Sequence, residues 1–107
     1  MNKIDRKFLE YHSDNPQIYD SIVRYARQLK AAGRTTFGIG AIVERIRWDY
    51  AISTKPDEKG FKISNDYRSR YSRLVMINCA DLRGFFKTKQ LEADSMYAEV
   101  HYELHPL

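Results

Sequence analysis

The sequence has one cysteine, Cys79, and no run of apolar residues long enough to cross a bilayer. One cysteine cannot form a disulfide within the chain, which favours a reducing compartment. A membrane-spanning helix needs about 18 or more apolar residues in succession, so the sequence predicts no transmembrane segment. The opening stretch MNKIDRKFLEYHSDN contains acidic residues and no apolar core, so we expect no signal peptide. These absences predict a cytoplasmic protein that does not bind membranes.

Motifs for catalysis are also missing. There is no Gly-rich phosphate loop with its Lys and Ser or Thr, and no Ser or Cys nucleophile beside a positioned base. Asp57, Glu58 and Lys59 are adjacent in a predicted loop, whereas a nuclease holds such groups on neighbouring strands around a metal ion. His101 and His105 are four residues apart but fall in a predicted strand, so they do not indicate a metal site. We expect a binding protein without a cofactor, not an enzyme.

Charge is unevenly distributed along the chain. Eighteen Lys and Arg against fourteen Asp and Glu give a net charge of only +4. Residues 24–34, however, contain four basic residues and no acidic one, and residues 62–90 contain seven basic residues against two acidic ones. From residue 91 onward there are four acidic residues and no Lys or Arg. Two basic blocks and an acidic end are more informative about partners than the total charge.

Hydrophobic periodicity predicts helices over the first three quarters of the chain. Residues 3–13 have apolar side chains at near-helical spacing and predict a short lead helix. Asn15 and Pro16 are typical of a helix start and Gly33 of a helix end, which predicts a helix between them. A second main helix is predicted from about residue 39 to 50, and a third from Ser64 or Asn65 to about residue 78.

The C-terminal part of the chain has a different period. FFKTKQL and MYAEVHYEL alternate as strands do, and the polar EADS between them predicts a hairpin. Three main helices followed by a C-terminal β-hairpin predict an α+β, winged helix-turn-helix-like fold. We expect one such domain over residues 1–107, with residues 1–14 as the lead helix. The link over residues 52–64 is longer than the three or four residues of a compact helix-turn-helix.

The helix over residues 65–78 predicts the function. Tyr67, Tyr71 and Leu74 share an apolar side, whereas basic and hydroxyl side chains lie on the other. In a winged helix this third helix enters the major groove, where Arg reads guanine and Ser serves bases or phosphates. Hairpin lysines would contact phosphate. The sequence therefore predicts binding to double-stranded DNA through Arg68, Ser69, Ser72, Arg73, Lys87 and Lys89.

Other interpretations stay open. The basic face of this helix can be a solvated surface with no ligand. The same holds for the face that carries Arg24, Arg27 and Lys30 on the helix predicted between Pro16 and Gly33. A protein-interaction adaptor of the same fold, contacting a host protein through Glu99 and Glu103 or forming a homodimer, is the alternative function. For single residues we expect structural roles: burial for Cys79, Tyr67 and Tyr71, and a core or hinge anchor, more than an interface hot spot, for Trp48.

Three segments carry a resemblance to a known family. IRWDY, FKISNDYRSRYSRLVM and GFFKTKQL are similar to segments of small phage- and prophage-encoded proteins of unassigned biochemical role. The similarity extends over about residues 18–91. It implies a phage or prophage protein, with a regulatory role as one expectation, and it brings no catalytic residue with it.

Overall fold

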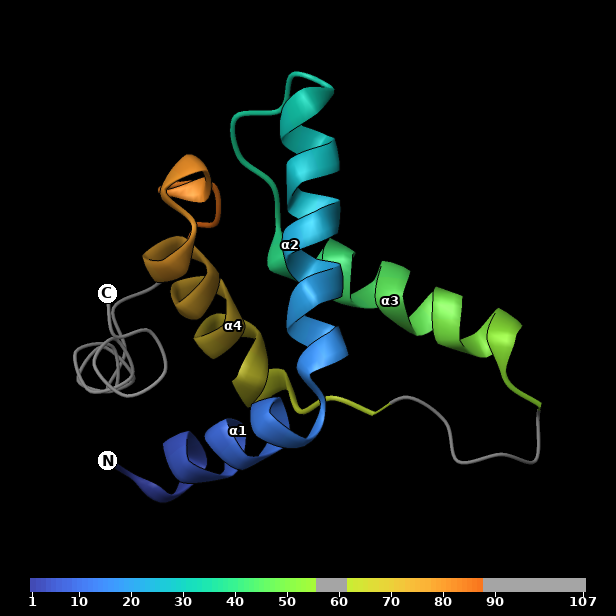
Figure 1. Ribbon diagram of the computed structural model, residues 1–107, viewed down its shortest axis with the longest axis vertical. Helices are drawn as coiled ribbons and strands as arrows, with labels where there is room; N and C mark the ends of the chain where they lie inside the picture. The colour runs from blue at the N-terminus through green and yellow to red at the C-terminus, as the bar shows by residue number, and fades with distance from the viewer. Residues whose placement is uncertain (56–61, 88–107) are drawn as a thin grey trace.

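Four α-helices and one 3-10 turn form the described part of the protein. The computed structural model describes residues 1–55 and 62–87. In chain order the elements are α1 (Lys3–Asp14), α2 (Pro16–Ala31), α3 (Ile39–Ser53), α4 (Asn65–Asn78) and the 3-10 turn η1 (Ala80–Leu82). In Figure 1, α2 rises through the middle of the molecule. η1 lies beside the upper, C-terminal half of α2, and α1 lies at the lower, N-terminal end of α2.

Local sequence explains where several helices begin and end. The Asn2 side chain accepts a hydrogen bond from the Asp5 amide at 2.8 Å, which satisfies a free N–H of the first turn of α1. Ser64 caps α4 in the same way through the Asp66 amide. Pro16 stands at the first position of α2, and Gly33 follows the helix with a φ of 100° that other residues rarely adopt.

α4 is the central helix of the fold. It contacts α1, α2, α3 and η1, and residues 70–75 are all buried. The core combines Phe8 of α1, Ile22 of α2, Ile46 of α3 and Leu74 of α4, all of them buried. Because six consecutive residues of a helix point in every direction around its axis, α4 has no continuous exposed face in this stretch.

The prediction of an α+β winged-helix fold is wrong. The described residues contain helices and a 3-10 turn but no strand. The predicted hairpin begins at Phe85, where the structure has no strand: Phe85 and Phe86 are both buried, with ring centroids 5.3 Å apart and edge to face. A strand would point these neighbours to opposite faces. The remainder of the predicted hairpin, residues 88–104, lies outside the described residues.

The helix predictions are confirmed, but α1 and Trp48 have other roles than the sequence predicts. The predicted helix over residues 3–13 is α1, and it inserts Phe8 into the core instead of serving only as a lead. Burial of Tyr71 and Cys79 is confirmed, and Tyr67 packs against the core. Trp48, predicted as a core or hinge anchor, is 65% exposed. None of the helices in the described part is long and apolar enough to span a membrane.

Candidate nucleic-acid interface

Two of the predicted DNA-contacting residues on α4 are buried. Ser72 is fully buried, and its hydroxyl donates to the Arg68 carbonyl at 3.1 Å. Arg73 is 2% exposed, and its guanidinium donates to the Ser69 carbonyl at 3.3 Å. Both side chains therefore donate hydrogen bonds to backbone carbonyls of their own helix. They do not form an exposed basic surface, because neighbouring elements cover α4.

The other predicted residues are dispersed. Arg68 lies over α3, where its Nη2 is 3.2 Å from Glu44 Oε1, and Ser69 is half-buried. Lys87 is exposed and lies beyond η1, and Lys89 lies outside the described residues. The structure thus does not bring the described members of the predicted set to one surface. The helical wheel misled because it places a side chain on a face without showing which neighbours cover that face.

Exposed cations do converge at the C-terminal end of α2. The Asp81 carboxylate accepts two hydrogen bonds from Arg27, at 3.0 and 3.2 Å, and its backbone carbonyl accepts one from Lys30. The hydrogen bonds from Arg27 lower the pKa of Asp81. These contacts tie α2 to η1 and fix the position of both basic side chains.

The loop after α2 and the segment after η1 bring further cations to this end. The Phe37 amide donates to the Phe85 carbonyl at 3.1 Å, so these two segments lie side by side. Gly84, with a φ of 78°, turns the chain before Phe85, whose buried ring anchors the segment. We call the resulting surface the basic end. It comprises the exposed cationic residues of these neighbouring segments, of which the first two bond to Asp81: Arg27, Lys30, Arg34, Arg83 and Lys87.

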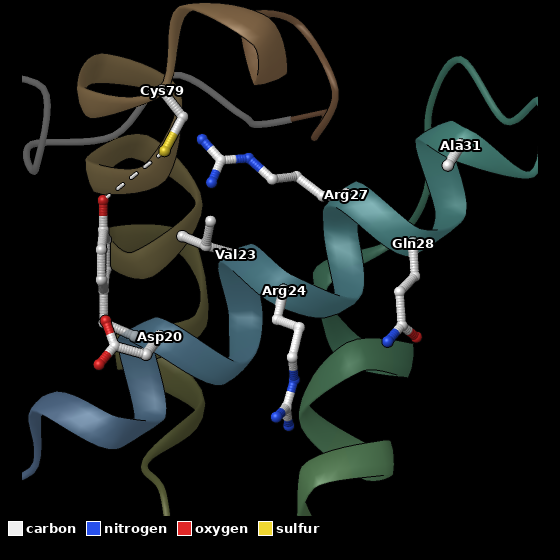
Figure 2. A pocket seen from close by; sticks show the side chains of 8 residues that line it. Asp20, Val23, Arg24, Arg27, Gln28, Ala31 and Cys79 are labelled. Carbon is white, nitrogen blue, oxygen red and sulfur yellow. Dashed lines mark hydrogen bonds between the residues drawn. The ribbon is translucent and has the colours of Figure 1, made fainter.

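A groove of about 700 Å³ adjoins the basic end along α2 (Figure 2). Arg27 extends from α2 toward Cys79 of α4, whereas Arg24 points the other way. Tyr19, at the α4 side of the groove, accepts a hydrogen bond from Asn78 at 2.9 Å and lies 3.9 Å from the Cys79 sulfur. Burial raises the pKa of Tyr19 to about 12.

The full sequence has eighteen Lys and Arg against fourteen Asp and Glu, a net charge of +4. A net positive charge attracts polyanions. Within the described ranges, no three His, Cys, Asp or Glu side chains gather in a way that could hold a metal ion.

Comparisons with protein-family models, curated proteins and solved structures found no significant match. The resemblance to phage- and prophage-encoded proteins therefore stays a prediction.

The sequence indicates only part of the basic end. The acid-free block over residues 24–34 indicates the part of the basic end that lies on α2 and the loop after it. The proximity of this block to Arg83 and Lys87 depends on the tertiary contacts of Asp81 and Phe85.

Proposed function

We propose that this protein binds double-stranded DNA and that the basic end contacts the phosphate backbone. The observation that carries the proposal is that three segments with exposed Lys and Arg residues meet at one end of the molecule, where Arg27 and Lys30 bond to Asp81 and the Phe37 amide bonds to Phe85. Lysine and arginine contacts to phosphate supply most of the sequence-independent affinity of DNA-binding proteins. Lys87 belongs both to this surface and to the residues predicted from the sequence.

The anchoring of the basic end supports this function. Arg27 and Lys30 are oriented by Asp81, and Phe85 fixes the backbone near Lys87. Side chains held in place lose less conformational freedom when they bind. Binding by this surface uses phosphate contacts and no recognition helix, so we expect little preference for base sequence.

A charge-reversal pair tests the proposal. Arg34→Glu with Lys87→Glu changes the basic end, and neither side chain makes a described ion pair. The matched control is Lys3→Glu with Lys7→Glu on α1, which makes the same change in total charge at the opposite end of the molecule (Figure 1). We expect the first pair to weaken binding to a random-sequence duplex much more than the second. Equal effects of the two pairs would show that only net charge matters and that the basic end is not a binding surface.

A further inference from the structure

α3 exposes two large apolar side chains one turn apart. Trp48 is 65% exposed and Ile52 is 72% exposed. Residues four apart lie on the same side of a helix, so the two form one apolar strip. Trp is the residue most enriched among those that dominate the energy of protein interfaces. The strip lies on a different helix from the residues of the basic end.

The strip continues a groove between α2 and α3. Ala41 and Arg45 share the side of α3 that carries Trp48 and Ile52, because the four positions follow helical spacing. Ala41 and Arg45 also line a groove of about 460 Å³. Its other walls include the apolar side chains of Leu29, Phe37 and Ile42. From Ala41 to Ile52 the surface extends about 16 Å, or about three turns of a helix.

Cations surround this surface. The guanidinium carbons of Arg24 and Arg45 lie 5.0 and 5.2 Å from the centroid of the Tyr25 ring, which fixes both at the groove. Arg47 and Lys55 are exposed elsewhere on α3 and just after it. The two carboxylates of α3 are already bound. Asp49 accepts hydrogen bonds from Tyr25 and Arg45, and Glu44 pairs with Arg47 and Arg68.

We propose that this α3 surface binds an amphipathic helix of a partner protein, with apolar residues on one face and Asp or Glu beside them. The apolar face would cover Trp48 and Ile52 and enter the groove, and the acidic residues would meet Arg24, Arg45 and Arg47. A second copy of this chain fits less well, because the chain carries a net charge of +4 and two copies repel. Nucleic acid also fits less well, because Ile52 offers no aromatic face for a base to stack on.

The only tryptophan in the chain provides the readout. The probes are a panel of synthetic helical peptides without Trp or Tyr, with Leu, Ile or Phe at positions i, i+3, i+4 and i+7 and Glu beside them. The control peptides have Lys in place of each Glu, or the same composition in a scrambled order. We expect saturable blue shifts of Trp48 emission with acidic amphipathic members of the panel and none with the controls. An oligothymidine strand is titrated in parallel and should leave the emission unchanged.

Variants locate the binding. Ile52→Glu and Arg45→Glu should each lower peptide affinity about tenfold or more, because each removes a proposed contact and adds a repulsive charge. Lys7→Glu on α1 is the matched control and should leave affinity unchanged. Circular dichroism checks that each variant is folded, and DNA binding by the Ile52→Glu variant should be retained, which separates this proposal from the function of the basic end.

Several results would overturn the proposal. One is unchanged emission with every acidic peptide, and another is an equal shift with the basic or scrambled peptides. A shift with oligothymidine alone would assign the surface to nucleic acid. A concentration-dependent shift without peptide, together with a dimer in sedimentation, would assign it to a second copy of the chain.

Discussion

Asp5 of α1 and Arg70 of α4 form a buried ion pair, with 2.8 Å between Asp5 Oδ1 and Arg70 Nε. The Asp5 side chain is fully buried and that of Arg70 is 8% exposed. Arg70 also donates to the Asp66 carbonyl at 2.9 Å. Because neither charge is solvated, each depends on the other, and the pair fixes α1 against the central helix.

Removing one partner of this pair should destabilise the protein strongly. We expect Asp5→Ala or Arg70→Ala to lower the free energy of unfolding by about 3–5 kcal/mol, because each leaves a buried charge without its partner. The double variant Asp5→Ala, Arg70→Ala should lose much less than the sum of the two. Urea denaturation of the four proteins measures the coupling. Additive losses would show that the two side chains do not interact.

α1 should be an integral part of the core. Phe8 is fully buried, and its ring meets that of Tyr71 edge to face at 4.8 Å between centroids. Phe8→Ala should cost about 3–5 kcal/mol of unfolding free energy, through lost burial and the cavity left behind. Ile4→Ala, one turn earlier on the same helix and 39% exposed, is the control and should cost much less. If thermal melts gave similar losses for both variants, α1 would be a lead segment, as the sequence predicts.

The sequence predicted the helices much better than their environments. Pro16, Gly33 and Ser64 mark helix ends by local backbone chemistry, and the structure has these ends. Burial depends on which helices meet. The helical wheel predicts an exposed Arg73, opposite the apolar side of its helix, and the aromatic character of Trp48 predicts a core or hinge anchor, yet each lies in the opposite environment. Residue type alone cannot show that α4 is central or that one side of α3 has no described neighbour.

Trp48 should behave as a solvated tryptophan in the native protein. Its emission maximum should lie close to that of the urea-unfolded chain, and acrylamide should quench both states to a similar extent, because 65% of its surface is accessible. No other tryptophan contributes to the signal. A native spectrum shifted well to the blue, with weak quenching, would mean that the residue is covered.

Acid should weaken the contacts of Asp49 and Asp81. A hydrogen bond from Tyr25 lowers the pKa of Asp49, and hydrogen bonds from Arg27 lower that of Asp81, both from 3.8. A carboxyl group with a lowered pKa stabilises the fold above its unfolded pKa, and this contribution is lost as the pH falls through the folded value. The melting temperature should therefore fall below pH 3.8, and less steeply in an Asp49→Asn, Asp81→Asn variant. If the melting temperatures of the two proteins fell equally steeply below pH 3.8, these contacts would be contradicted.

Asp81 also limits the positive potential of the basic end. Asp81→Asn removes the carboxylate that bonds to Arg27 and so releases that side chain from its ion pair. We expect this variant to bind duplex DNA more tightly than the unmodified protein, because the loss of a negative charge outweighs the loss of Arg27 orientation and the contact of Lys30 with the backbone carbonyl is kept. The gain should be larger at low salt, where charge interactions are least screened. Glu10→Gln on α1 is the matched control for the loss of one negative charge, and it should have little effect. Unchanged affinity on substitution of Asp81 would argue against phosphate binding at this end.

The most direct test of DNA binding by the basic end is a fluorescence-anisotropy titration with a random-sequence duplex over a series of salt concentrations. For the unmodified protein, the logarithm of the association constant should fall linearly with the logarithm of salt concentration, with a slope of about −0.9 per phosphate contacted. The Arg34→Glu, Lys87→Glu variant should have weaker binding and a shallower slope, whereas Lys3→Glu, Lys7→Glu should keep the slope. No binding by the unmodified protein at low salt, or the same slope for all three proteins, would contradict the proposed function.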